Sequence, residues 1–317
     1  YSPGKEANPH IDFDKYASLM SKINNAIEHD AAGIFFITPE DQDDTLMEMG
    51  VTNVTPKEVP IVHLRRDALK QLGVSLTEPQ IASIEGVVEL EKVRDTGYNV
   101  VGYLPGQVDS TIVIGAHYDH LGYGGPGSGS RYLGEEKLIH NGADDNGSGT
   151  SVLLELARYY ASRPDELRHS LLFAAFSGEE FGILGSGNDA KNMTVDSSRV
   201  RMMINVDMVG RLSQKDSGLA VLGTGTTEAF AAYFDSLKRD DVTIVQKKAG
   251  QGPSDHTAFY NRSIPVLMFF TGAHNDYHKP EDDIEKIDFA GLVKVADVVK
   301  DAIDYFDEYS GALTFVK

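Results

Sequence analysis

The stretch SLLFAAFSGEE, residues 170–180, decides how this chain folds. Its run 170–176 is almost entirely apolar and has the length of a buried strand. Two adjacent carboxylates, Glu179 and Glu180, follow shortly after it. They would repel each other and resist desolvation unless a cation lies nearby, although a solvated turn is the simpler alternative. The stretch therefore prompts a search for metal ligands elsewhere in the chain.

Strands and helices alternate on both sides of this stretch. Beyond residue 110, apolar runs predict strands at 111–116, 170–176, 200–206, 219–222, 242–246 and 265–270. Helical periodicity predicts helices at 150–162, 183–192, 227–238 and 288–308. Strands that alternate with helices form a mainly parallel sheet covered on both faces. We therefore expect an α/β fold built on a mainly parallel, mixed sheet flanked by helices.

The first 86 residues are predicted to form a smaller α/β domain. Helices are expected at 15–29, 41–50 and 66–73, and strands at 32–37 and 59–64. Alternating apolar positions in 87–94 and 98–104, on either side of Asp95-Thr96-Gly97, predict a β-hairpin. We place the domain boundary just before that hairpin, which gives domains over 1–86 and 87–317.

The composition limits what the chain can bind. Its 317 residues include 48 acidic and 29 basic side chains, a formal net charge of −19. This charge argues against binding to nucleic acid or to an anionic membrane surface. No apolar run approaches the ~20 residues that a membrane-spanning helix needs. The chain has no cysteine, so disulfides, thiolate metal sites and thiol nucleophiles are excluded.

Side chains that can bind a metal ion lie at or beyond the carboxyl ends of four predicted strands: His117 with Asp119, Glu179 with Glu180, Asp207, and His278. These ends meet at one edge of a parallel sheet, so the side chains are expected to lie close together. Asp144, in the glycine-flanked loop 141–149, can reach the same edge. The two imidazoles together with three of these carboxylates would suit two divalent ions that share a bridging carboxylate. Zinc is the first expectation, with manganese or cobalt as alternatives.

One glycine-rich segment, GYGGPG at 122–127, has the glycine pattern of a dinucleotide-binding loop. That fingerprint requires a helix directly after the glycines, whereas Pro126 and a run of serine and glycine continue the loop here. Neither a Walker-type phosphate loop nor the nucleophile elbow of serine hydrolases occurs. We therefore expect a loop without a nucleotide.

Five segments resemble the M28 family of co-catalytic zinc peptidases, in its aminopeptidase branch: IGAHYDHLG, NGADDNGSG, FSGEEFGILGS, NVDMVGR and DYHKPEDD. They occur in the family's order and extend the resemblance over roughly residues 97–308. It implies a di-zinc aminopeptidase that removes N-terminal residues from peptides with a free N-terminus. A hydroxide bridging the two Zn²⁺ ions would attack the scissile carbonyl.

The resemblance also implies a metal-binding role for each ligand. Asp144 would bridge the two zinc ions. His117 and Asp207 would complete one ion, and Glu180 and His278 would complete the other. The peptide bond after the bridging residue, Asp144–Asp145, would be cis.

Further residues receive roles from the same resemblance. Glu179 would be the general base, and Asp119 would orient His117, as a carboxylate beside a metal-bound imidazole often does. Tyr277 would donate a hydrogen bond to the oxyanion. In the motif Ser254-Asp255-His256, Asp255 would support the ligands and His256 would be structural.

Other interpretations stay open. A carboxypeptidase or dipeptidase on the same fold would need a cationic clamp for the substrate carboxylate, and Arg211 is the candidate for it. A glutaminyl cyclase-like acyltransferase would use a single zinc ion. A catalytically dead binding module is a further alternative, and the intact Glu179 argues against it.

The first domain has a weaker resemblance of its own. KINNAIEHDAAGIFFI followed by EVPIVHL is similar to about half of a protease-associated (PA) domain, which many secreted M28 enzymes carry before the catalytic core. The resemblance implies a secreted or periplasmic location.

Overall fold

The computed structural model describes residues 18–46, 57–74, 85–90, 94–125, 127–134, 136–214 and 218–317. The chain divides into two compact units, Tyr1–Arg94 and Asp95–Lys317. The division falls after Arg94, later than the predicted boundary before residue 87. Each unit is described by itself below.

The first unit contains a two-stranded parallel sheet of β1 (Ile34–Ile37) and β2 (Ile61–Leu64). Two helices accompany it, α2 (Leu19–Glu28) and α3 (Arg66–Gln71). All four elements were predicted from the sequence, and each lies within its predicted range. The likeness of this unit to part of a PA domain stays a prediction.

The predicted helix over 41–50 is wrong in its described part, because residues 41–46 form a turn followed by irregular backbone. Arg66 holds this segment in place. Its backbone N–H donates to Asp44 Oδ2 at 2.8 Å, and its guanidinium donates to the carbonyl oxygen of Gln42 at 3.0 Å. Through these bonds, the carboxylate of Asp44 and the backbone carbonyl of Gln42 contact a residue outside their own segment.

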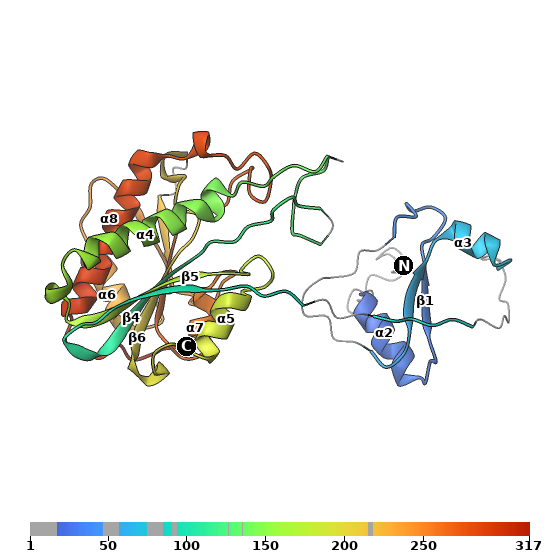
Figure 1. The fold of residues 1–317 in the computed structure, drawn as a ribbon, viewed down its shortest axis with the longest axis horizontal. Coiled ribbons are helices and arrows are strands. Elements are labelled where there is room, and N and C mark those ends of the chain that lie inside the picture. The colour runs from blue at the N-terminus through green and yellow to red at the C-terminus, as the bar shows by residue number, and fades with distance from the viewer. Residues whose placement is uncertain are drawn as a thin grey trace, which may run out of the picture. The chain divides into compact units, whose positions relative to one another are not determined.

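The second unit is built on a seven-stranded mixed sheet in the order β3-β5-β4-β6-β9-β7-β8 (Figure 1). Its strands are β3 (Val100–Leu104), β4 (Val108–His117), β5 (His169–Phe176), β6 (Val200–Val206), β7 (Leu219–Leu222), β8 (Ile244–Lys247) and β9 (Val266–Phe270). The four adjacent strands β5, β4, β6 and β9 are parallel to one another. The strands β3 and β7 run antiparallel to β5 and β9. The predicted mixed α/β sheet is confirmed.

Helices cover both faces of this sheet (Figure 1). On one face, α4 (Gly149–Ala161), α6 (Glu228–Ser236) and α8 (Phe289–Glu308) pack over one hydrophobic cluster. On the other, α5 (Leu184–Lys191) and α7 (His256–Tyr260) pack over a second cluster. Successive strand residues point to opposite faces: in β4, Ile112 and Ile114 enter the first cluster and Val113 enters the second. Because both faces are buried, the central strands read as continuous apolar runs.

The predicted hairpin is wrong. Val100–Leu104 forms the strand β3, but its antiparallel partner is β5. No strand forms over the described residues 85–90, and the side chain of Val87 there is 83% exposed. Alternation of apolar residues marked the strand correctly but could not identify its partner.

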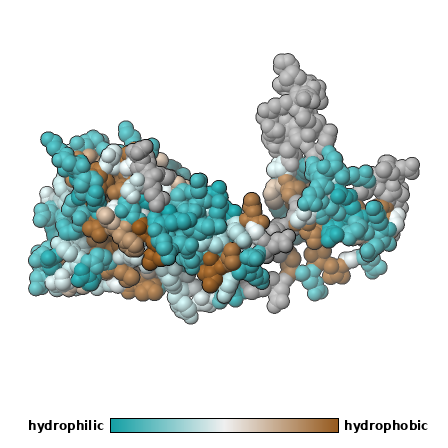
Figure 2. Space-filling view, turned by 90° about the horizontal axis from the view of Figure 1, so that it is seen from above, coloured by the Kyte–Doolittle hydropathy of each residue, from teal (hydrophilic) through white to brown (hydrophobic). Residues whose placement is uncertain are grey.

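The surface agrees with the 24% content of charged residues, which is ordinary for a globular protein. Hydrophilic residues cover most of the face of each unit that is visible in Figure 2, between smaller hydrophobic areas. Within the described ranges, no helix is both long and apolar enough to cross a membrane.

A buried polar group lies at the amino ends of β4 and β5. Asp307, on α8, accepts backbone N–H bonds from Arg168 at 2.9 Å and from His169 at 2.7 Å. The His169 ring contacts the hydroxyl of Ser110 through Nδ1. Burial, together with the positive charge of Arg201, lowers the pKa of His169. This end of the sheet therefore favours a neutral imidazole.

Candidate metal centre

The opposite end of the sheet collects the side chains that the sequence singles out. His117 ends β4, Glu179 and Glu180 follow β5, and Asp207 follows β6. His278 lies in the segment after β9. These four strands are adjacent and parallel, so their carboxyl ends form one edge. The predicted convergence of these segments is what the sheet order produces.

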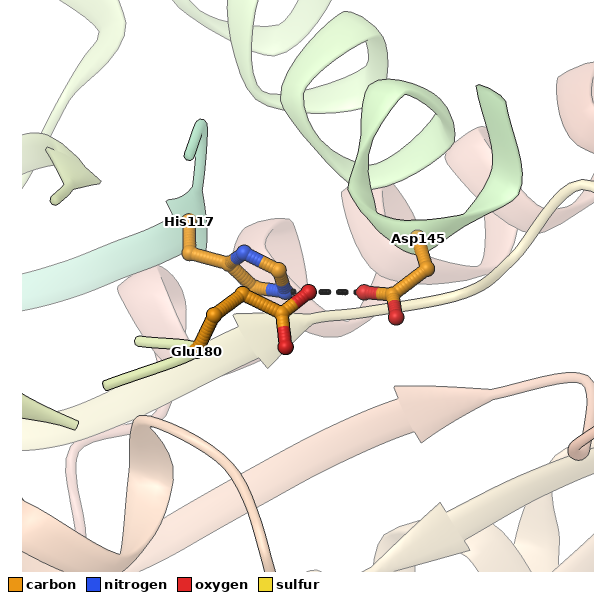
Figure 3. A group of neighbouring side chains, drawn as sticks. All are labelled: His117, Asp145 and Glu180. Carbon is orange, nitrogen blue, oxygen red and sulfur yellow. Dashed lines mark ion pairs between the residues drawn. The ribbon is translucent and has the colours of Figure 1, made fainter. Parts of the chain in front are cut away.

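Three side chains form the centre of this group. Figure 3 shows His117, Asp145 and Glu180 converging from β4, from the turn before α4 and from the segment after β5. One potential ligand atom from each lies within 4.8 Å of the others. All three side chains are largely buried, which is unusual for carboxylates without a compensating positive charge.

Asp145 divides its two carboxylate oxygens between two imidazoles. Its Oδ1 lies 3.2 Å from His117 Nε2, and its Oδ2 lies 3.3 Å from His278 Nε2. A second carboxylate stands beside each imidazole: Asp207 Oδ1 is 3.5 Å from His117 Nε2, and Glu180 Oε2 is 3.0 Å from His278 Nε2. The arrangement is two half-sites, each with one imidazole and one carboxylate, that share Asp145.

The sequence predicts Asp144 in this shared position, whereas the structure places Asp145 there. Asp144 Oδ1 accepts a hydrogen bond from the Gly210 N–H at 2.6 Å, and its Oδ2 faces His274 Nε2 at 3.2 Å. Asp144 and Asp145 lie in the single turn Ala143–Ser148, where Asp145 has the non-helical angles φ −105° and ψ 89°. This backbone turns the two neighbouring side chains to different sides. The cis peptide bond is likewise one residue later than predicted, between Asp145 and Asn146.

The pKa values of the two imidazoles and of Asp145 show that positive charge is favoured beside these carboxylates. Burial lowers the pKa of His117, but the charge of Asp207 and hydrogen bonds to Asp145 and Asp207 outweigh it and raise that pKa well above its usual value. Hydrogen bonds to Asp145 and Glu180 likewise overcome burial and raise the pKa of His278 to about 10. Hydrogen bonds to both imidazoles lower the pKa of Asp145 in spite of its burial. Imidazole nitrogens and carboxylate oxygens in this arrangement fit zinc.

Glu179 differs from its neighbour Glu180. Burial raises the pKa of Glu179 to about 9 against the opposing charge of His117, and Asp255 and Asp207 add to the rise. Glu180 makes close contacts with two imidazoles, so its pKa is lowered despite burial. The adjacent glutamates therefore differ in environment: contacts with imidazoles favour the charged form of Glu180, and burial favours the protonated form of Glu179.

Asp119 contacts the group in a way that differs from the prediction in detail. His117 Nδ1 lies 3.1 Å from the backbone carbonyl oxygen of Asp119, whereas the carboxylate Oδ1 of Asp119 is 3.8 Å away. That carboxylate accepts backbone N–H bonds from Glu179 at 3.1 Å and from Glu180 at 3.4 Å. Asp119 thus supports the imidazole with its main chain and the two glutamates with its side chain.

Tyr277 stacks on the ring of His278, with 3.8 Å between ring centroids. Burial and the nearby charges of Asp145 and Glu180 raise the pKa of its phenol. The hydroxyl is therefore protonated at neutral pH and able to donate a hydrogen bond. Its action on an oxyanion stays a prediction.

Two contact residues were missed in the sequence. His120 Nδ1 lies 2.6 Å from Glu180 Oε1, and the Ser254 hydroxyl donates to Asp207 Oδ2 at 2.7 Å. Both stand inside motifs that drew attention for other residues. In the second motif the contact with Asp207 comes from Ser254, while Asp255 is fully buried with a pKa raised by that burial to about 7. His256 is also fully buried, and burial lowers its pKa to about 4, which fits the structural role predicted for it.

Arg211, the candidate clamp for a substrate carboxylate, is hydrogen-bonded to two aspartates of this chain. Its guanidinium donates to Asp282 Oδ1 at 2.7 Å and to Asp276 Oδ2 at 3.4 Å. The side chain is 1% exposed. A substrate carboxylate would have to displace these partners to reach it.

Residues 99–303 match peptidase family M28. A probable leucine aminopeptidase of Trichophyton verrucosum (strain HKI 0517) is 30% identical over 213 residues, 64% of this chain and 54% of that protein. Aminopeptidase YwaD of Bacillus subtilis (strain 168) is 28% identical over 304 residues, 90% of this chain and 59% of that protein. The structure of a zinc aminopeptidase from Bacillus subtilis superposes with a TM-score of 0.52 at 28% identity, covering 69% of this chain and 53% of that one. This chain thus spans little more than half the length of these relatives.

Proposed function

Because the chain belongs to peptidase family M28, we propose that it is a zinc aminopeptidase that binds two zinc ions at the carboxyl edge of its sheet. The observation that carries this proposal is the division of the Asp145 oxygens between His117 and His278. A single-zinc site, as in a cyclase, would not need a carboxylate shared between two imidazoles. The aminopeptidases among its relatives support the choice of reaction.

The half-sites assign the ligands. One zinc ion would be held by His117, Asp207 and Asp145, and the other by His278, Glu180 and the same Asp145. Zinc bound there would lower the pKa of a water molecule and polarise the substrate carbonyl.

Glu179 supplies the proton transfer. Burial favours the protonated form of its carboxyl group, and the positive charge of bound zinc would lower that pKa so that Glu179 can act as a base. Asp119 holds its backbone in place. In this role Glu179 takes a proton from the attacking water and returns it to the leaving amine. Tyr277, protonated and stacked on His278, is placed to donate to the developing oxyanion.

The charge of the site selects the end of the peptide. With two zinc ions bound, the four carboxylates of Asp145, Asp207, Glu179 and Glu180 would balance the charge of the metal, so the site would offer no surplus of positive charge to a C-terminal carboxylate. A free α-amine could bind zinc in its neutral form. A carboxypeptidase would need Arg211 as its clamp, and that guanidinium is buried against Asp282 and Asp276. The substrates we propose are therefore peptides and aminoacyl amides with a free α-amine.

The test uses matched pairs of peptides with an apolar first residue. We expect cleavage from the amino end when the α-amine is free, no cleavage when it is acetylated, and full activity when the carboxyl end is amidated. The control is Glu179→Gln, which keeps the shape of the side chain: it should retain its zinc and lose ~10²–10⁴-fold in turnover. Cleavage of the acetylated peptide together with protection by C-terminal amidation would overturn the proposal in favour of a carboxypeptidase.

A further inference from the structure

Asp282 connects three of the segments that carry the proposed ligands. It lies a few residues after His278 and is fully buried. Its Oδ2 accepts two consecutive backbone N–H bonds, from Asp144 at 2.9 Å and from Asp145 at 3.0 Å. Its own backbone carbonyl accepts the N–H of Ala143 at 3.0 Å. Three consecutive backbone N–H groups of the turn that presents Asp145 are therefore held by this residue.

The second oxygen of Asp282 is held from the Asp207 segment. Arg211, which follows Asp207 in the chain, donates to Asp282 Oδ1 at 2.7 Å. Bonds between ionised partners are among the strongest hydrogen bonds in proteins, and a buried carboxylate without them would be costly. Arg211 thus holds the carboxylate of Asp282, and that carboxylate in turn holds the backbone of the turn that contains Asp145.

The same turn contains two adjacent aspartates, and the anchoring determines which of them faces the imidazoles. The side chain of Asp144 is bonded to the N–H of Gly210, in the Asp207 segment. The backbone N–H groups of both aspartates are bonded to Asp282. With these positions held, the carboxylate of Asp145 points between His117 and His278.

We propose that Asp282, fixed by Arg211, is a positioning residue that sets the bridging carboxylate of Asp145 for metal binding; this rests on the two-metal site proposed above. Asp282 does not touch the metal ions or the substrate. It acts through the backbone of the turn, so its loss should loosen both half-sites together.

The chain offers a matched control at the other end of the sheet. Asp307 is also a buried aspartate that accepts two consecutive backbone N–H bonds, from Arg168 and His169. These bonds lie at the amino end of β5, whereas Glu179 and Glu180 follow its carboxyl end. Asp282→Ala and Asp307→Ala therefore remove the same kind of anchor, one near the proposed metal centre and one away from it.

The experiment measures zinc affinity by competition with a chelator, and the absorption spectrum of the protein loaded with cobalt. For Asp282→Ala we expect a ~10–100-fold loss of affinity, the usual effect of removing a residue that orients a metal ligand, and a changed cobalt spectrum. Asp307→Ala should keep the wild-type affinity and spectrum even where it lowers the unfolding temperature. Asp282→Asn retains an oxygen for the two N–H groups, so it should lie between Asp282→Ala and wild type.

The outcomes separate this inference from the proposed function. Wild-type zinc affinity in Asp282→Ala, or an equal loss in Asp307→Ala, overturns the positioning role. If Asp282→Ala does not fold, Asp282→Asn decides: an unchanged cobalt spectrum and affinity would count against the role. Wild-type protein that binds two zinc ions without cleaving any free-amine peptide would refute the peptidase proposal and leave the metal-binding comparison valid.

Discussion

The two ends of the central sheet both bury aspartate and histidine side chains, but the histidine pKa values shift in opposite directions at the two ends. At the amino end, Asp307 gives both carboxylate oxygens to backbone N–H groups, and the pKa of His169 is lowered. At the carboxyl end, each oxygen of Asp145 faces an imidazole, and the pKa values of His117 and His278 are raised.

The difference shows that burial of polar residues does not by itself make a metal site. A carboxylate whose charge is already compensated by backbone N–H groups leaves little attraction for a cation. Carboxylates that face imidazoles leave both groups ready to exchange a proton for a metal ion, since imidazole binds metals in its neutral form. The partner of the carboxylate decides the chemistry of each end.

The largest expected effect comes from replacing each of the two adjacent aspartates, Asp145 and Asp144, by alanine in separate variants. Asp145→Ala removes the oxygen shared by both half-sites, so we expect it to lose both zinc ions and all measurable peptidase activity. Asp144→Ala should bind two zinc ions, although the loss of its bond to Gly210 should lower stability. Elemental analysis of the purified variants gives the answer. Loss of both ions from Asp144→Ala, with retention in Asp145→Ala, would restore the assignment made from the sequence.

A second test follows the protons at the carboxyl end. The raised pKa values favour protons on His117 and His278 before metal binds. Zinc must displace them, so we expect at least one proton to be released per zinc ion. Calorimetric titrations of chelator-treated protein in two buffers with different ionisation enthalpies measure this release. Identical heats in both buffers would show that the imidazoles are neutral beforehand.

The smallest expected effect concerns the amino end. Because the folded state lowers the pKa of His169, the neutral ring contributes stability above the ordinary histidine pKa of about 6.5, and this contribution is lost as the pH falls below it. In His169→Asn this part of the acid sensitivity should disappear. Urea unfolding at pH 7.5 and pH 5 compares the variants, with the exposed His29→Asn as control. A loss of stability toward pH 5 as large in His169→Asn as in wild type would contradict the assignment.

The sequence predicted most of the sheet because the central strands are buried on both faces. Continuous apolar runs such as 170–176 are distinctive, and polar residues at their carboxyl ends must share one edge of a parallel sheet. The convergence of His117, Glu180, Asp207 and His278 followed from this rule alone. The resemblance to M28 peptidases pointed to the same residues.

Other features depend on contacts that a sequence does not display. Asp144 and Asp145 are chemically identical neighbours, and only the backbone angles of the turn and the bond of Asp144 to Gly210 separate them. The apolar alternation of residues 98–104 marked a strand, but its partner β5 lies far along the chain. The segment 41–46 is not helical and is hydrogen-bonded to Arg66, a residue that local periodicity does not connect to it.

The buried pair of Arg211 and Asp282 also constrains how this sequence can change over evolutionary time. Replacing either partner alone leaves the other as an uncompensated buried charge, at a cost of about 3–5 kcal/mol. Such a cost is comparable to much of the stability of a typical domain, so single substitutions at these positions are rarely tolerated. Related sequences should therefore retain both residues or exchange them together. Variation at position 211 then becomes informative about position 282, although the two stand in different loops.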